Sequence, residues 1–212
     1  MSATHTAPAT PSHPINIGSV KVWYEHHESI VSNSALRKVI NQMIDEKIRT
    51  EFDNDSYMDA LILNEIMLDR SSKTVRMLSG GCTYFLETLQ DAFTKAFERL
   101  HAANGKIRIL VVGTEIPAFL AAAQKKYAGT LQVSSAQARN EDQVEHFIVC
   151  DSIMARVEKP HVRLQQNTPI DAIKAKVSFN NASTAKFYED RFDAVWKVLH
   201  ETTATPDNTA QA

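Results

Sequence analysis

Residues 146–158 read HFIVCDSIMARVE, in which two short apolar runs flank the pair Asp151-Ser152. Short apolar runs on either side of turn-forming residues are typical of two β-strands joined as a hairpin. The sequence therefore predicts strands over Phe147–Cys150 and Ile153–Val157. These thirteen residues also carry most of the polar side chains on which the functional interpretation depends.

On both sides of this hairpin, apolar runs alternate with helical stripes. Ile107–Val112 is continuously apolar, as expected of a strand that is buried on both faces. Helices are predicted where apolar residues recur every three or four positions. The predicted strands outside the hairpin are Thr74–Leu78, Ile107–Val112, Leu131–Val133 and Ala175–Phe179, and helices follow the first, second and last. This order predicts an α/β fold with a mixed, mainly parallel sheet, helices on both faces, and the hairpin as an extension.

The N-terminal third of the chain is predicted to be mainly helical. Apolar residues from Leu36 to Ile48 fall at helical spacing, Tyr57–Leu68 predicts a second helix, and Lys21–Tyr24 predicts an edge strand. We expect a single domain over residues 16–200, divided into a helical part (16–70) and a core (71–200). Residues 1–15 and 201–212 are rich in small and polar residues and are predicted to be disordered tails.

Composition sets limits on the kind of partner and compartment. The net charge of −2 does not favour a nucleic-acid partner. No stretch approaches the roughly 20 apolar residues of a membrane span, and the N-terminus lacks a basic segment followed by an apolar one, so a cytoplasmic protein is expected. No cofactor motif is apparent. The second half of the chain nevertheless holds a run of basic residues: Lys125, Lys126, Arg139, Arg156, Lys159, Arg163, Lys174 and Lys176.

Three smaller features favour structural interpretations. Cys82 and Cys150 lie in or beside apolar stretches and are expected to be buried free thiols rather than a disulfide. Ser79-Gly80-Gly81 lacks the spacing of a phosphate-binding loop and is expected to be a plain turn. His26-His27 has no second ligand group at suitable spacing, so no metal site is predicted.

The hairpin block, together with KVSFNN (176–181) and FYEDRFDAVW (187–196), resembles the phospholipase D superfamily. The shared features are a strand-turn-strand hairpin, a strand ending in Asn, and a helix ending in Phe-x-x-x-Trp. The resemblance covers roughly residues 70–200 and rests on element order and hydrophobic pattern. It implies a phospholipase D-like fold present as a single copy, and single-copy members of this superfamily pair as homodimers with a symmetric interface.

The residues that carry catalysis in that family are replaced here. The family signature is His-x-Lys-x-x-x-x-Asp followed by Gly-Ser-x-Asn, in which the His attacks the phosphodiester. Aligning Asp151 with the signature Asp places Val144 at the nucleophile and His146 at the Lys. Residues 155–158 (ARVE) occupy the region of the Gly and Ser. In the other register, with His146 as nucleophile, Ile148 replaces the Lys, so neither register completes the set.

The candidate groove or binding residues are His146, Asp151, Arg156, Glu158 and Asn180. Arg156 and Glu158 are two apart and share one face of a strand. Two interpretations remain open for them. They line a retained binding groove, or they form a buried ion pair that fills it, with His146 satisfied by a neighbouring carboxylate such as Glu145 or Asp151.

The first functional hypothesis is a noncatalytic binding or regulatory protein, such as an inhibitor or adaptor from a bacterial mobile element that restrains conjugative transfer. Its expected partner is another protein, with a small anionic ligand as a further candidate. The second hypothesis is a phosphodiesterase or nuclease with a rearranged site that uses His146 with Asp151 and His161. The third is a nucleic-acid-binding module that uses the basic residues of the second half, whose binding would fall steeply with salt.

Overall fold

The structure is a computed structural model and describes residues 35–54, 57–80, 83–113, 115–138, 143–161 and 174–201. The predicted strand at Lys21–Tyr24, the tail at 1–15, residues 202–212, Cys82 and His26-His27 lie outside these ranges. In chain order the elements are α3 (Ala35–Asp45), β1 (Thr50–Asn54), α4 (Tyr57–Arg70), β2 (Thr74–Ser79), α5 (Thr83–Thr88), α6 (Gln90–Ala102), β3 (Lys106–Val112), α7 (Ala118–Lys126), β4 (Leu131–Ala136), β5 (His146–Cys150), β6 (Met154–Glu158), β7 (Ala175–Phe179) and α8 (Ala182–Glu201).

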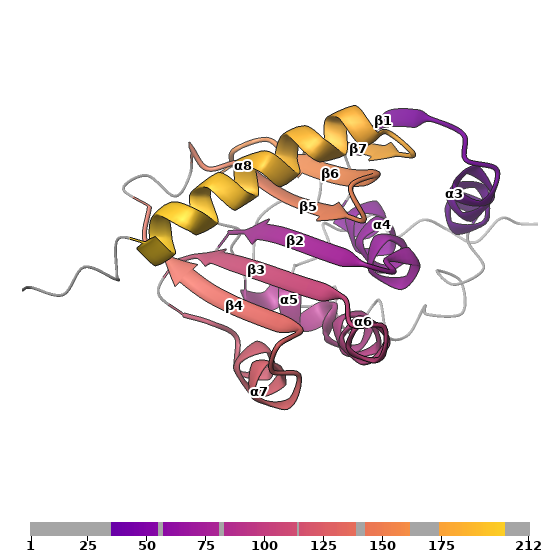
Figure 1. Cartoon of the computed structure of the whole chain (residues 1–212). Helices are drawn as coiled ribbons and strands as arrows, with labels where there is room; N and C mark the ends of the chain where they lie inside the picture. Colours follow the sequence, from indigo (N-terminus) through magenta and orange to yellow (C-terminus); the bar gives the residue numbers. More distant parts are fainter. Residues whose placement is uncertain are drawn as a thin grey trace, which may run out of the picture.

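The strands form one mixed sheet in the order β1-β7-β6-β5-β2-β3-β4 (Figure 1). The α/β class is confirmed, but the expectation of a mainly parallel sheet is wrong. Only β2, β3 and β4 run parallel, and the other four pairings are antiparallel. The β5–β6 hairpin lies in the middle of the sheet because β5 pairs antiparallel with β2. Apolar runs indicate that a strand is buried, but they carry no information on its direction.

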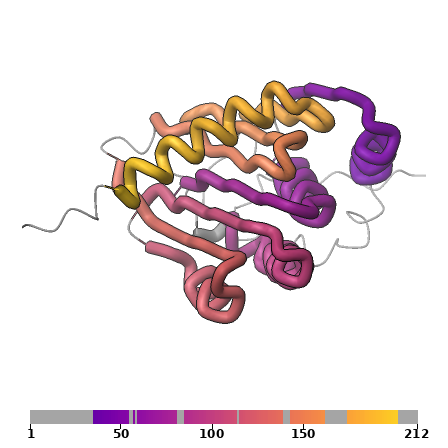
Figure 2. The backbone as a smooth tube through the Cα atoms, in the orientation of Figure 1, coloured from indigo at the N-terminus to yellow at the C-terminus, as the bar shows by residue number. Residues whose placement is uncertain are grey.

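Different helices cover the two faces of the sheet (Figures 1 and 2), as the sequence predicts. On one face α8 lies across β2, β5 and β6, and its Ala185 and Phe192 pack with Leu78, Leu110 and Phe147. On the other face α4 contacts β5, α6 contacts β3, and α7 contacts β4. The main core lies there, because alternate residues of each strand point to that side.

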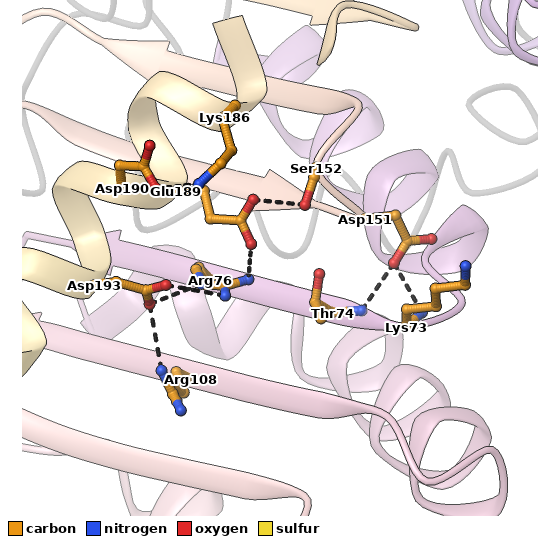
Figure 3. Close-up of polar contacts among 10 residues, drawn as sticks. All are labelled: Lys73, Thr74, Arg76, Arg108, Asp151, Ser152, Lys186, Glu189, Asp190 and Asp193. Carbon is orange, nitrogen blue, oxygen red and sulfur yellow. Dashed lines mark hydrogen bonds and ion pairs between the residues drawn. The ribbon is translucent and has the colours of Figure 1, made fainter. Parts of the chain in front are cut away.

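Charged side chains also join α8 to the sheet (Figure 3). Arg76 on β2 lies 2.6 Å from a Glu189 oxygen and donates from Nε to Asp193 at 2.9 Å. Arg108 on β3 reaches the same Asp193 at 3.3 Å, and the Ser152 hydroxyl donates to Glu189 at 2.6 Å. We call these five residues the α8-side network. It connects the helix to two strands and to the hairpin turn.

Asp151, in the turn between β5 and β6, has a structural role (Figure 3). Its carboxylate accepts hydrogen bonds from the backbone N–H groups of Ser72, Lys73 and Thr74, at 2.7–2.8 Å, and from the Ser72 hydroxyl at 2.8 Å. Its backbone has a φ of 51°, in the left-handed region that Asp and Asn tolerate better than most residues. Asp151 therefore fixes the start of β2 against the hairpin.

Most predicted elements are confirmed, with two differences. β1 was not predicted, because TEFDN is short and polar and is stabilised by pairing with the distant β7. The single helix expected after the strand Thr74–Leu78 is divided into α5 and α6 at Leu89. Cys150 is buried and free, as expected, and burial raises the pKa of its thiol. Over the described residues, every helix is too short or too polar to span a bilayer.

Candidate functional site

Polar side chains gather on the face of the sheet opposite α8, where β5 begins and β6 ends. His146 on β5 pairs in register with Glu158 on β6, and Arg156 lies two residues before Glu158 on the same strand face. His161 follows three residues after β6 ends. We call His146, Arg156, Glu158 and His161 the histidine cluster. The hairpin register thus brings together three of the five residues that the sequence singled out.

The two imidazoles converge on one carboxylate oxygen. His146 Nδ1 lies 3.5 Å from Glu158 Oε2, and His161 Nε2 lies 3.3 Å from the same atom. The two rings meet edge to face with their centroids 5.0 Å apart. The side chains of both histidines and of Glu158 are only 10–13% exposed. Three polar side chains from two strands and a loop therefore share one small, mostly buried volume.

The second oxygen of Glu158 is held by a buried arginine. Arg156 Nη1 contacts Glu158 Oε1, and Arg156 Nε donates to Asn54 Oδ1 at 3.0 Å. Asn54 belongs to β1 and reaches across Ala175 of β7, which pairs with both Asn54 and Glu158. Arg156 is 3% exposed, and its Nη2 has no hydrogen-bond partner among the described residues.

The electrostatic environment keeps the Glu158 carboxyl ionised. Burial alone would raise the pKa of this group, since a charge in a poorly solvated site is costly. The Arg156 guanidinium and hydrogen bonds from His146, His161 and Arg156 outweigh that cost and hold the pKa of Glu158 well below its usual range. One anionic group therefore serves three nitrogen-bearing side chains.

A glycine lets the His146 ring lie where it does. A Cβ placed on Gly80, just after β2, would come 2.6 Å from His146 Nε2, closer than real contacts allow. Beside the ring is a pocket of about 30 Å³, lined by the histidine cluster together with Ser79, Gly80 and Phe85 among others. A volume of this size holds about one or two water molecules.

Two of the residues proposed from the sequence lie elsewhere. Asp151 sits at the far end of β5 from His146, and its carboxylate is engaged by the start of β2, so the expected His146–Asp151 pair does not form. Asn180 donates through Nδ2 to the carbonyl oxygens of Met43 and Ile48, both at 3.1 Å. These two hydrogen bonds hold the connection between α3 and β1 against the end of β7. Each was misplaced because a short polar residue after a strand also serves as a turn or capping group.

The position aligned with the family nucleophile is part of the hydrophobic core. Val144 is half-buried and packs against the cluster beneath α8, on the other face of the sheet from His146. The neighbouring Glu145 pairs with Arg191 rather than with His146. The carboxylate that satisfies His146 is therefore Glu158, across the hairpin, and not a sequence neighbour.

Sequence reasoning missed Asn54 and Gly80 and gave His161 only a minor place. Asn54 contacts Arg156 across 102 positions, for which the sequence holds no signal. The position of Glu158 and His161 beside His146 could have been predicted from the register of the hairpin. The turn spans Asp151–Ile153, so residues whose numbers add to 304 face each other, as Cys150 and Met154 do. That register places His146 opposite Glu158, and His161 follows within three residues.

Comparison with known proteins gives similarity only at the level of the fold. No family model matches the chain, and no curated protein matches it. Among solved structures, TrmBL2, described as an archaeal chromatin protein with a novel mode of DNA binding, matches with a TM-score of 0.52 and 16% identity, over 88% of this chain and 70% of that one. The phospholipase D family member Nuc from Salmonella typhimurium matches with a TM-score of 0.47 and 12% identity, over 70% and 95%. NucT from Helicobacter pylori matches with a TM-score of 0.46 and 8% identity, over 70% and 95%.

Proposed function

We infer that this chain is a noncatalytic, phospholipase D-like binding or regulatory protein that acts by protein–protein contact. The observation that carries the inference is Val144. With Asp151 aligned to the signature Asp, Val144 stands at the position of the attacking imidazole, and its half-buried side chain packs against the core beneath α8. An isopropyl group cannot attack a phosphodiester, so the covalent step of that family has no nucleophile here.

The size of the pocket gives further support. Pockets for small ligands occupy several hundred Å³. The pocket beside His146 measures about 30 Å³ and is bordered by a buried, ion-paired Arg156 and Glu158. This small volume supports a binding role rather than turnover of a phosphodiester.

A surface for a protein partner is available on α8. Phe187 is 62% exposed, and Val195 and Val198 are exposed along the same side of the helix. Large apolar side chains at the centre of an interface supply much of its binding energy. The proposed partner is another protein, as for an inhibitor or adaptor of a bacterial mobile element that restrains conjugative transfer. Pairing of two copies as a homodimer is part of the same proposal.

The test is capture of partners from the native cell with the full chain as bait. The bait proteins are wild type, Phe187→Ser, and Val39→Ser as a matched control that alters an exposed apolar residue on α3. We expect wild type and Val39→Ser to capture the same partner. In a binding measurement with purified proteins, Phe187→Ser should bind that partner at least about tenfold more weakly than wild type does. Equal binding by all three would overturn the assignment to α8. Baits that lack residues 1–15 or 202–212 are compared with wild type. Loss of capture by these truncated baits would overturn recognition of the partner by the folded body.

The two converging imidazoles favour one alternative, a phosphodiesterase or nuclease with a rearranged site. His146 and His161 are 5.0 Å apart between centroids, close enough to act on one group. Purified protein would then hydrolyse a generic phosphodiester or single-stranded DNA, and His146→Ala would abolish turnover. The same samples report on nucleic-acid binding without cleavage, which would weaken steeply as salt rises. Turnover lost in His146→Ala would replace the noncatalytic proposal.

A further inference from the structure

The two imidazoles of the histidine cluster make only long contacts to the carboxylate oxygen that they share. The two imidazole contacts to Glu158 Oε2 measure 3.5 and 3.3 Å, whereas N–H···O hydrogen bonds are usually 2.7–3.2 Å. Both rings nevertheless turn a nitrogen toward the same oxygen. The spacing is therefore too long for a tight hydrogen-bonded triad, although the groups are pointed at one another.

The same spacing matches the coordination shell of a small dication. Zinc is bound by imidazole nitrogen and carboxylate oxygen at about 2.0–2.2 Å, so neighbouring ligand atoms in a tetrahedron lie about 3.4 Å apart. The measured distances are 3.5 and 3.3 Å, and the three ligand atoms all lie within 4.8 Å of one another. We propose that His146, Glu158 and His161 form a binding site for a first-row transition-metal dication of the zinc class.

The surroundings resemble the supporting contacts of metal sites. Ligating carboxylates and histidines are usually held in place by further hydrogen bonds. Here Arg156 holds Oε1 of Glu158, which leaves Oε2 to face the imidazoles, and Asn54 in turn accepts a hydrogen bond from Arg156. Gly80 leaves the space in which the His146 ring lies. Two of the three ligands, His146 and Glu158, therefore come from paired strands and are backed by buried side chains, and His161 comes from the loop after β6.

Three protein ligands leave a fourth position for a water molecule or an anionic oxygen. Sites with three protein ligands and one open position are typical of zinc centres that bind exchangeable ligands. The pocket beside the histidine cluster has room for one or two waters. Arg156 lines it, and among the described residues the Nη2 atom of Arg156 has no hydrogen-bond partner. This site would take the metal whether or not α8 binds a protein partner, so it stands apart from the proposed function.

The experiment measures metal content and affinity in the full chain. Apo protein is dialysed against zinc with a competing chelator, and bound metal is counted by mass spectrometry. Cobalt substitution reports geometry, because four-coordinate Co²⁺ absorbs strongly in the visible range. Wild type should retain one metal ion per chain. Loss of a hydrogen bond that supports a metal ligand costs roughly 10–100-fold in affinity. His161→Ala and Glu158→Gln remove the ligands themselves and should lose at least about 100-fold.

Controls exclude other histidines. His101→Ala alters a ring that pairs with Thr130 on another part of the molecule, and His26→Ala/His27→Ala removes the adjacent pair near the N-terminus. Both should bind zinc as wild type does. Gly80→Ala keeps all three ligands but displaces the His146 ring, so it should weaken binding and alter the cobalt spectrum. Circular dichroism establishes that each variant is folded. Absence of retained zinc in wild type, or retention by folded His161→Ala and Glu158→Gln, would overturn the proposal.

Discussion

The sheet carries polar side chains on both faces, and the two sets differ in composition and in burial. In the α8-side network two arginines meet two carboxylates, and Asp193 is 40% exposed. In the histidine cluster one carboxylate serves an arginine and two imidazoles, and Arg156 is 3% exposed. The partly exposed network holds a helix in place. The buried cluster is costly to desolvate, and buried groups of ionisable side chains are characteristic of functional sites.

The largest effect that separates the two sets should come from Arg156→Met. The substitution leaves Glu158 buried without its guanidinium, and breaking a buried ion pair from one side costs about 3–5 kcal/mol. Urea denaturation measures the loss in the free energy of unfolding. The double variant Arg156→Met/Glu158→Leu should recover most of it, because no charge then remains uncompensated. A loss below about 1 kcal/mol in the single variant would mean that the pair is effectively solvated.

Asp151→Ala should come next, at about 2 kcal/mol, because three backbone N–H groups lose a charged acceptor. Alanine also fits the left-handed backbone at this position poorly. Asp151→Asn is the matched control, since it keeps an acceptor oxygen and tolerates that backbone, and it should lose less. Thermal unfolding of the three proteins measures the order. Metal binding at the histidine cluster should be unchanged in both variants.

Acid should weaken the histidine cluster in a defined direction. The folded-state pKa of Glu158 is lowered, so its contribution to stability is fully present above the unfolded pKa of about 4.3 and is lost as the pH falls toward the folded pKa. One group changes the free energy of unfolding by at most about 1.4 kcal/mol per pH unit. Stability measured from pH 5 to pH 3 should therefore fall less steeply for Glu158→Gln than for wild type. Parallel curves would contradict a lowered pKa.

The smallest effect is expected for Asp193→Asn in the α8-side network. Partly exposed ion pairs contribute about 0–1 kcal/mol and are screened by salt. Arg76 also keeps Glu189 as a partner in this variant. Denaturation at low and high ionic strength should show a difference from wild type that shrinks as salt rises. A loss as large as that of Arg156→Met would remove the distinction between the two sets.

Local sequence patterns predicted most of the elements but not their pairing. Ala175–Phe179 was predicted with its observed bounds, and the α4 helix was predicted from its apolar spacing. The antiparallel direction of β5 beside β2 was not predicted, because a buried strand has the same apolar pattern whether its neighbour is parallel or antiparallel. The same reason explains β1, whose five polar-rich residues become a strand only because β7 supplies the hydrogen bonds.

The part of the candidate site that lies on the β5–β6 hairpin could be predicted from the sequence. His146, Arg156 and Glu158 come together through local register, which the spacing around the turn encodes. Asn54 and Gly80 arrive from distant strands, so their contribution depends on topology. Asp151 and Asn180 were assigned to the groove because they match the Asp and the strand-ending Asn of the family pattern. In the structure their side chains make backbone hydrogen bonds that hold a strand start and a loop.

The pairing of β1 with β7 has a consequence for how the protein is made. β7 lies between β1 and β6, so Asn54 can meet Arg156 only after residues 175–179 have been synthesised and inserted. Contacts between such distant parts of a chain form late and slow folding. A nascent or truncated chain that ends before β7 would contain every residue of the histidine cluster and still leave its arginine without the asparagine that anchors it. It would also leave the β6 edge of the sheet unpaired, and unpaired strand edges make incompletely folded chains prone to aggregation.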